Sequence, residues 1–207
     1  MKVIDITMSP IIITIGGNIG CGKSTIIEEL NTYFKDTCTI IPEPIDEWGS
    51  WLDLFYTDPS KHAFGFQMKV LHSFLKNMRQ VNNIAITERS PIDSLQVFCK
   101  VSYQDNIMNH LEYNLFKEYV DDIGWKPNVY IYLHTNPEVC IERIKRRGRG
   151  CETGLNEQYI HKLHQQYENM EVGCKHHMVD ANQEKDQVFY EVYEIIASIL
   201  DLDRINN

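Results

Sequence analysis

The sequence lacks the features that place a protein in a membrane, on nucleic acid or outside the cell. No apolar run approaches the roughly 18–20 residues that span a bilayer, and the N-terminus has neither a signal pattern nor an Arg-rich amphipathic leader. Lysine and arginine number 20 against 29 aspartates and glutamates, which gives a formal net charge of −9. Duplex nucleic acid is excluded as the main partner, because its affinity comes largely from cations placed on phosphates. We expect a cytoplasmic protein with small-molecule ligands.

Cysteine pairs, internal repeats and linkers are also missing. The six cysteines are dispersed without a C-x-x-C pair, so neither a zinc knuckle nor a redox site is indicated. His176 and His177 are adjacent, and neighbouring side chains in a strand point to opposite faces, so no shared metal is expected there. The 207 residues contain no low-complexity stretch. We therefore predict a single domain over residues 1–207.

Short apolar segments alternate with helical patterns along the chain. This alternation predicts an α/β fold with a five-stranded parallel sheet flanked by helices. The predicted strands are 11–15, 39–41, 84–87, 129–133 and 178–180. The predicted helices are 23–34, 62–80, one that begins after Asn136, one capped by Asn156 and one over 183–200. The side chains predicted to point inward from the first two helices are Ile26, Ile27, Leu30, Tyr33 and Phe34, then Phe66, Val70, Leu71, Phe74 and Met78.

A glycine-rich segment follows the first predicted strand and opens the first helix. It matches the pattern G-x-x-x-x-G-K-[ST] with Gly17, Asn18, Ile19, Gly20, Cys21, Gly22, Lys23 and Ser24, followed by Thr25. In such a loop, backbone N–H groups and the helix N-terminus surround phosphate oxygens, the lysine reaches the β and γ phosphates, and the hydroxyl holds Mg²⁺. The sequence therefore predicts binding of a nucleoside triphosphate.

The phosphate loop alone does not separate a switch GTPase, a motor ATPase and a small-molecule kinase. There is no N-K-x-D sequence for reading guanine, and no apolar run ends in Asp-Glu as in motor ATPases. Glu88 follows the strand 84–87, at the edge where α/β sheets build their sites. We assign Glu88 and Ser24 to Mg²⁺. The alternative is that Glu88 only pairs with Arg89.

Glu43 lies between Pro42 and Pro44, directly after the second predicted strand. The prolines predict a rigid extended loop, and a carboxylate held there suits a general base. An alcohol acceptor needs such a base, because its hydroxyl proton must leave during phosphoryl transfer. A phosphate acceptor needs none. The alternative for Glu43 is an exposed loop carboxylate without a catalytic role.

An amide and several aromatic residues follow in the chain. Gln67 is an amide within an otherwise apolar helical stripe, and an amide can donate to and accept from a nucleobase edge at once. Trp48, Phe66 and Phe74 can supply flat walls for a base. The same pattern is also typical of core aromatics around one satisfied glutamine.

Five cations stand in the seven residues 143–149, and glycines follow at 148, 150 and 154. The pattern predicts a short basic lid over about residues 145–155 that closes on transferring phosphates. Two alternatives are a solvated helix end, where basic residues are favourable in any case, and an arginine tract that binds RNA.

Six segments together resemble the deoxynucleoside kinase family, which includes insect multisubstrate deoxynucleoside kinase, mitochondrial thymidine kinase and deoxycytidine kinase. In family order they are GGNIGCGKST, PEPIDEW, LDLFYTDPSKHAFGFQ, TERSPIDS, TNPEVCIERIKRRGRGCE and VDAN, and they cover almost the whole chain. The resemblance implies a P-loop kinase three-layer sandwich. It also implies transfer of the ATP γ-phosphoryl group, with Mg²⁺, to the 5′-OH of a deoxynucleoside, by a homodimer assembled through helices.

The resemblance also assigns roles to the residues that match the acceptor side of the family's site. Glu43 is similar to the base that takes the 5′-OH proton, and Arg89 steadies that region. Tyr56 and Glu152 correspond to the residues that hold the 3′-OH. The residues implied to pair with the base or to line its pocket are Gln67, Trp48, Phe66 and Val70.

On the donor side, Arg147 and Arg149 correspond to lid arginines that stabilise charge on the donor phosphates together with Lys23. The loop that contains Asp180 and Asn182 is implied to lie by the donor adenine. The partners implied are a deoxynucleoside and a nucleoside triphosphate, without nucleic acid or membrane.

Two pocket positions depart from relatives. Phe74 stands where deoxycytidine kinase has an arginine and the insect enzyme a methionine, and Ser94 stands where deoxycytidine kinase has an aspartate. We therefore expect pyrimidine deoxynucleosides, thymidine first and deoxycytidine next, although the bulk of Phe74 can also narrow the pocket. The alternatives are a nucleoside monophosphate kinase of the thymidylate type and a regulator that binds nucleotide without catalysis.

Overall fold

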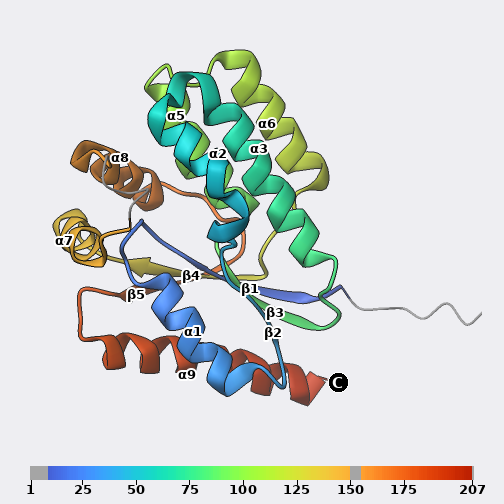
Figure 1. Cartoon of the computed structure of the whole chain (residues 1–207). Helices are drawn as coiled ribbons and strands as arrows, with labels where there is room; N and C mark the ends of the chain where they lie inside the picture. The colour runs from blue at the N-terminus through green and yellow to red at the C-terminus, as the bar shows by residue number, and fades with distance from the viewer. Residues whose placement is uncertain (1–8, 150–154, 207) are drawn as a thin grey trace, which may run out of the picture.

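The computed structural model describes residues 9–149 and 155–206, which form three layers with helices on both faces of one sheet (Figure 1). The five strands are parallel and lie in the order β2-β3-β1-β4-β5. In chain order they are β1 (Ile11–Gly16), β2 (Thr39–Ile41), β3 (Ile84–Glu88), β4 (Val129–His134) and β5 (Lys175–Asp180). The predicted α/β sandwich with its five-stranded parallel sheet is confirmed.

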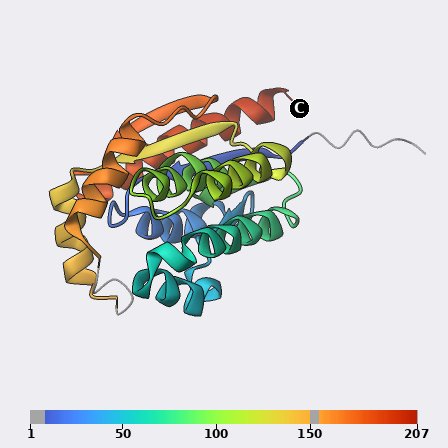
Figure 2. The ribbon, with the colours of Figure 1, turned by 90° about the horizontal axis from the view of Figure 1, so that it is seen from above.

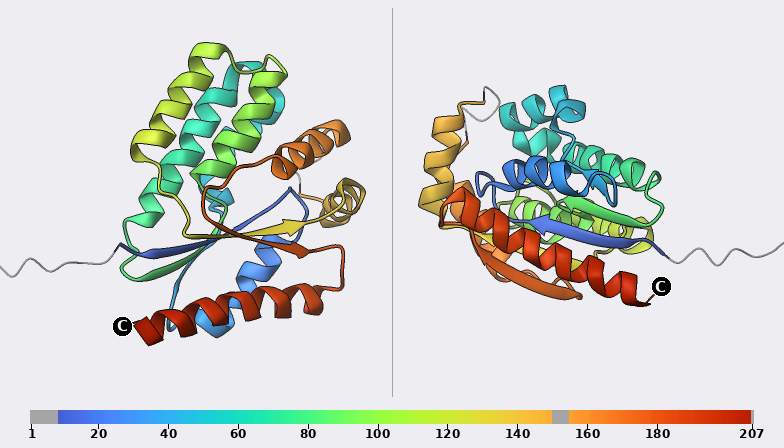
Figure 3. Two further views of the ribbon diagram at one scale, coloured as in Figure 1. Left: turned by 180° about the vertical axis from the view of Figure 1, so that it is seen from behind. Right: turned by 90° about the horizontal axis from the view of Figure 1, so that it is seen from below.

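Helices α1 and α9 cover one face of the sheet, and α3, α5 and α6 stand on the other (Figure 3). Helices α7 and α8 lie together at one end of the molecule (Figure 2). The helical segments in chain order are α1 (Lys23–Phe34), α2 (Ile45–Thr57), α3 (Pro59–Met78), α4 (Pro91–Asp93), the π-helical η1 (Ser94–Cys99), α5 (Lys100–Gln104), α6 (His110–Ile123), α7 (Pro137–Arg147), α8 (Glu157–Glu168) and α9 (Lys185–Asn206). Among the described residues, none of these helices combines the length and the apolar character needed to cross a bilayer.

The central strand β1 explains why its sequence is a continuous β-branched run. It pairs with β3 on one side and β4 on the other, and helices cover both of its faces, so Ile13 and Ile15 are fully buried. Their side chains join a core cluster with α1 and α9, while a second cluster forms between α2, α3 and α6. The core thus fixes the end of β1, where the phosphate loop begins.

Gly16 ends β1 at a point where a side chain has no room. A Cβ atom there would lie 1.7 Å from the hydroxyl oxygen of Tyr130 on the neighbouring strand β4. That phenol is fully buried and donates a hydrogen bond to Oδ1 of Asp93 at 2.6 Å. The space above Gly16 is therefore filled by a side chain that anchors the segment after β3.

Several predicted boundaries differ from the structure. Strands β1, β3 and β4 each continue one residue past the predicted end, and α9 begins at Lys185 and reaches Asn206. Strand β5 begins at Lys175, three residues before the predicted start. Within the described part of the chain it is an edge strand that pairs only with β4, so the polar residues Lys175 and His176 remain exposed in it.

Two side chains that were predicted to point inward, those of Tyr33 and Met78, are not buried in the core. Tyr33 is 59% exposed, and its ring lies against the rings of Phe189 and Tyr193 on α9, with centroids 5.3 and 5.6 Å away. The reason is that α1 packs on both the sheet and α9, so Tyr33 sits at the rim of this contact. Met78 is only half-buried, because α3 ends there.

The sequence analysis also misses several helices. The predicted extended loop around Glu43 is limited to 42–44, because α2 begins at Ile45. No helix was predicted in the region of 91–123, where the structure has α4, η1, α5 and α6. A π-helical stretch interrupts the 3.6-residue period there. The readable signal is the capping box in which Asn109 and Glu112 bond each other's backbone at the start of α6.

Candidate functional site

The phosphate loop joins β1 to α1 in the conformation that its glycines require. Gly20 has φ +82°, and a Cβ atom there would lie 2.6 Å from the carbonyl oxygen of Cys140. The buried ammonium of Lys23 donates to the carbonyl oxygen of Asn18 at 2.8 Å. The amide of Asn18 in turn donates to the carbonyl of Ile160 on α8. The loop therefore forms the predicted cradle, with its lysine inside.

Ser24 and Glu88 meet at the start of α1. The Ser24 hydroxyl donates to Oε1 of Glu88 at 2.8 Å, and Oε2 of Glu88 accepts from the backbone N–H of Glu43 at 3.3 Å. Glu88 is buried at the end of β3, and no ion pair with Arg89 is recorded for it in the described residues. A hydroxyl beside a carboxylate is the oxygen-only donor set that suits Mg²⁺. The structure thus brings together the two residues assigned to the metal.

Glu43 and Arg89 form a buried ion pair. Both carboxylate oxygens of Glu43 accept from Nη1 of Arg89 at 2.5 Å, and each side chain is only 7% exposed. The same guanidinium donates from Nη2 to the carbonyl of Gly17 and from Nε to the hydroxyl of Tyr167. The backbone of Arg89 has φ +61°, a strained value for a residue with a side chain. Arg89, which follows β3 and donates to the phosphate loop, therefore holds Glu43 in place. Glu43 is not the exposed loop carboxylate of the alternative interpretation.

Burial raises the pKa of Glu43 above its ordinary value. The nearby Arg89 guanidinium opposes this shift, and the neighbouring Glu88 carboxylate reinforces it. Glu43 in turn raises the pKa of Arg89, which keeps the guanidinium charged. A carboxylate with a raised pKa is a stronger base, which is the property that proton removal from a hydroxyl requires.

A second layer of polar residues fixes the arginine. The Tyr167 hydroxyl accepts from Arg89 and donates to Oδ1 of Asp93 at 3.2 Å. Asp93 is fully buried and also accepts from Tyr130 and from Ser90. Sequence reasoning missed this network. Its one readable signal is the capping box, in which Asp93 and Ser90 bond across the start of α4.

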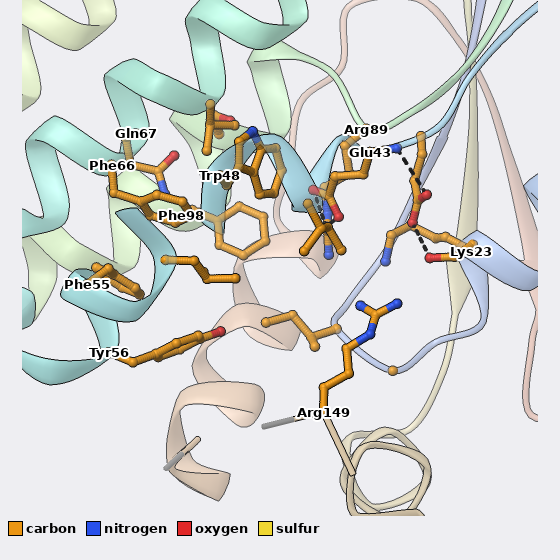
Figure 4. Close-up of a pocket in the computed structure, with 18 of the residues that line it drawn as sticks. Lys23, Glu43, Trp48, Phe55, Tyr56, Phe66, Gln67, Arg89, Phe98 and Arg149 are labelled. Carbon is orange, nitrogen blue, oxygen red and sulfur yellow. Dashed lines mark hydrogen bonds and ion pairs between the residues drawn. The ribbon is translucent and has the colours of Figure 1, made fainter. Parts of the chain in front are cut away.

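An apolar cavity extends from Glu43 and Arg89 between α2, α3 and η1 (Figure 4), and Tyr159 of α8 also lines it. Trp48, Phe66 and Val70 line it, as predicted from the resemblance, together with Tyr56 and Ser94. Gln67 is 3% exposed, and its Oε1 is buried without a hydrogen-bond partner among the described residues. The cavity therefore presents one unpaired acceptor between aromatic walls.

Phe74 does not line this cavity. It is buried behind Trp48, with the two ring centroids 6.5 Å apart, and it also contacts Trp125. The expectation that Phe74 is a wall of the base pocket is therefore not met by the cavity that the structure shows. Gln67 and Phe74 stand seven residues apart and nearly on one line of α3, so Phe74 lies about two turns further along the helix, where it packs in the core cluster around Trp48.

Phe98 is a lining residue that sequence reasoning missed. It belongs to η1, and the guanidinium carbon of Arg89 lies 4.9 Å from its ring centroid, a cation–π contact. Further walls come from residues to which the sequence analysis gave no role, namely Ile45, Leu52, Phe55 and Tyr159. Phe98 and Tyr159 are far in the sequence from the other three, and only the fold brings them together.

The arginines of the basic segment 143–149 make two different kinds of contact. Arg143 donates to the carbonyls of Cys21 and Ala181, so it braces the phosphate loop. Arg147 and Arg149 line the cavity beside Lys23 and the loop (Figure 4 shows Arg149 there). Glu152, the second residue expected at the 3′-OH, lies outside the described residues.

A second hollow lies on the other side of the phosphate loop. Gly22, Thr25 and Asn182 line it, and so does Arg147. Asp180 accepts from the backbone and the amide of Asn182, and Asn182 accepts from the backbone N–H of Asn136. These hydrogen bonds hold the loop after β5 in place at the rim of this hollow. Asp180 stabilises the loop but does not line the hollow.

Comparison with known proteins agrees with this geometry. The family model for deoxynucleoside kinases matches residues 13–201. The chain belongs to the deoxynucleoside kinase family. The kinase is 34% identical over 192 residues to putative kinase protein 029R of Invertebrate iridescent virus 3, covering 91% of this chain and 97% of that one. It is 31% identical over 198 residues to the thymidine kinase of Ictalurid herpesvirus 1, covering 90% and 86%.

Among solved structures, the kinase is similar to a deoxyadenosine kinase from M. mycoides described with dCMP and dCDP bound. The TM-score is 0.81 at 28% identity, covering 91% of this chain and all of that one. This likeness confirms the P-loop kinase fold, and the kinase is an enzyme with an ATP-dependent phosphoryl-transfer site.

Replacing Arg89 with alanine leaves the Glu43 carboxylate buried without its guanidinium partner. We expect the free energy of unfolding to fall by about 3–5 kcal/mol in urea denaturation, because one partner of a buried pair is then uncompensated. The control is Lys76→Ala, which breaks an exposed pair with Glu47 at 3.1 Å. Its expected cost is at most about 1 kcal/mol. Equal small losses in both variants would contradict the structural role of the Glu43–Arg89 pair.

Proposed function

We propose that this kinase transfers the γ-phosphoryl group of ATP to the 5′-OH of a pyrimidine deoxynucleoside, with thymidine the best substrate and deoxycytidine next. The observation that carries the proposal is the position of Glu43. Its buried carboxylate lies between the lysine of the phosphate loop and a cavity with aromatic walls. A base at this junction is needed for an alcohol acceptor and has no task for an acceptor that is already a phosphate.

The cavity supports a neutral, flat nucleobase. Trp48, Phe66 and Phe98 provide the walls on which a base can stack, and the unpaired Oε1 of Gln67 can accept from an N–H on its edge. Trp48, Phe66 and Gln67 carry no charge, and Ser94 contributes only a hydroxyl. Phe74 supports the site indirectly, because it packs behind Trp48.

In the proposed reaction, Glu43 accepts the proton from the 5′-OH as that oxygen attacks the γ-phosphorus, and the bond from the γ-phosphorus to the β,γ-bridging oxygen breaks to release ADP. Arg89 holds the carboxylate in place, and Lys23 with Arg147 and Arg149 stabilises charge on the transferring group. Ser24 and Glu88 would hold Mg²⁺, which would neutralise charge on the phosphates when bound. Tyr56, which lines the cavity, and Glu152 would hold the 3′-OH.

The donor would occupy the second hollow. Its phosphates would lie on the phosphate loop, and its adenine would lie by the loop that contains Asn182, with Asp180 behind it. This arrangement places the donor and the acceptor on opposite sides of Lys23, which lines both spaces. An in-line transfer needs such an arrangement.

The proposed assembly is a homodimer built on α6. Four apolar residues, spaced four apart on one face of this helix, are exposed by 41–77%: Leu111, Leu115, Tyr119 and Ile123. The opposite face buries Phe116 and Val120 against the rest of the kinase. A second copy can cover the stripe with its own, since a self-complementary helix face suits two-fold symmetry.

We further propose that residues 1–207 act as one domain in the cytoplasm, where the product serves the synthesis of DNA precursors. Free thiols support this location, because Cys21, Cys38, Cys99, Cys140 and Cys174 are unpaired in the structure. Reducing compartments keep cysteines in this state.

A coupled assay with Mg-ATP and a panel of nucleosides and nucleoside monophosphates tests the function. We expect thymidine to have the highest kcat/KM, deoxycytidine to follow, and the monophosphates to be turned over at background rates. A best rate with thymidylate would replace the proposal by a monophosphate kinase. A best rate with deoxyadenosine or deoxyguanosine would reject the pyrimidine preference. Binding of ATP without any turnover would make the protein a regulator.

The double variant Leu111→Glu/Leu115→Glu tests the dimer, because four charges would then meet in a two-fold interface. We expect the wild type to be a dimer and the variant a monomer in sedimentation or light scattering. The control is Leu54→Glu, which places a charge on an exposed leucine of α2 and should leave the dimer intact. A monomeric wild type, or a dimer in the double variant, would refute the proposed interface.

A further inference from the structure

Three metal-ligating side chains meet outside the catalytic cavity. His134 is the last residue of β4, and His164 and Glu168 stand four residues apart on α8, so the last two share one helix face. One ligand atom of each residue lies within 4.8 Å of those of the other two. None of the three lines the cavity or the hollow beside the phosphate loop. We propose that they form a binding site for one divalent transition-metal ion of the zinc type.

The donor atoms are of the kind that zinc prefers. Two imidazole nitrogens and one carboxylate oxygen form a three-ligand set that leaves a fourth position open for water or another ligand. The set differs from the oxygen-only pair of Ser24 and Glu88, which suits Mg²⁺. The two sites therefore select different ions.

The spacing of the three side chains fits an ion after a small rearrangement. Ligand atoms at about 2.0–2.1 Å from zinc stand roughly 3.3–3.5 Å apart in a tetrahedral site. Nε2 of His134 already lies 3.6 Å from Oε1 of Glu168. Side-chain rotation alone can close the remaining gap, because the Glu168 and His134 side chains are 40% and 27% exposed. This exposure also gives an ion access to the site.

The partners of the three residues support ligation. Nδ1 of His164 is buried and has no hydrogen-bond partner among the described residues, which is costly for a ring nitrogen unless something binds there. The hydroxyl of Tyr132 donates to Oε1 of Glu168 at 2.8 Å, and its ring lies edge-on to His134, 5.9 Å between centroids. A bond of this kind orients a carboxylate ligand.

An ion at this position would tie α8 to the end of β4. Helix α8 carries Tyr167, which binds Arg89, and Ile160, whose carbonyl accepts from Asn18 in the phosphate loop. The backbone carbonyl of His134 accepts from Ala181 in the loop beside the second hollow. An ion in this site would therefore fix the relative positions of three segments near the catalytic residues, namely α8, the end of β4 and the loop after β5. We expect the ion to raise the thermal stability of the kinase.

Isothermal titration of the full-length kinase with ZnCl₂, and with MgCl₂ as reference, tests the proposal. We expect one zinc ion per chain and a rise in Tm on zinc addition, and no comparable binding of Mg²⁺ in the absence of nucleotide. Co²⁺ in the same site should give the visible absorption of a four- or five-coordinate ion. His134→Gln and His164→Gln should each weaken zinc binding by at least about tenfold, and Tyr132→Phe by about tenfold.

The matched control is His72→Gln, which removes an exposed histidine of α3 and should bind zinc like the wild type. Cys174→Ser is a second control, because Cys174 is the one cysteine among the described residues that is not buried and could bind zinc by its thiol. This variant should also bind zinc like the wild type. The absence of saturable zinc binding in the wild type would overturn the proposal. Equal affinity in the wild type and both histidine variants, or loss of binding only with Cys174→Ser, would overturn it as well.

Discussion

The ion pair between Glu43 and Arg89 is the interaction on which the rest of the site depends. Taking two charges out of water costs several kcal/mol per ion, so the pair is stable only when its remaining hydrogen-bonding capacity is satisfied. The structure meets this condition, because Arg89 also donates to the carbonyl of Gly17 and to Tyr167. The backbone of Glu43 is held by Glu88. One pair thereby connects the phosphate loop, the ends of β2 and β3, and α8.

The sheet topology explains why these residues can meet. Strands β2, β3 and β1 are neighbours and parallel, so their carboxyl ends lie at one edge. Glu43 follows β2, Glu88 ends β3 and the phosphate loop follows β1. The proposed acceptor base, the proposed magnesium ligand and the proposed cradle for the donor phosphates therefore come from three adjacent strand ends, as is general for α/β sheets. The aromatic cavity above them comes from helices on a single face of the sheet.

Local patterns in the sequence were enough to predict the five strands, the phosphate loop between β1 and α1, and the position of Glu43 directly after a strand. Each depends on neighbouring residues: a β-branched run, a glycine spacing, or two prolines around a carboxylate. The partner of Glu43 was not predictable from the residues, because Arg89 is 46 positions away and reaches it only through strand pairing. The same holds for Asp93, whose partners Tyr130 and Tyr167 lie 37 and 74 positions further on. Phe74 and Tyr33 were misplaced because periodicity gives a helix face but not the element that the face meets.

The pH dependence of kcat and kcat/KM for the wild type and Glu43→Gln, with thymidine and Mg-ATP, tests the central role of Glu43 most directly. In the wild type, kcat/KM should fall on the acid side with a midpoint above the ordinary glutamate pKa of about 4.3, since burial raises the pKa of Glu43 and protonation removes the base. In Glu43→Gln, kcat should fall by about 10²–10⁴, the acid limb should vanish, and thymidine should still bind. Glu47→Gln, a change to an exposed carboxylate on α2, serves as the control and should behave like the wild type. A Glu43→Gln variant with the kcat and pH profile of the wild type would contradict the account.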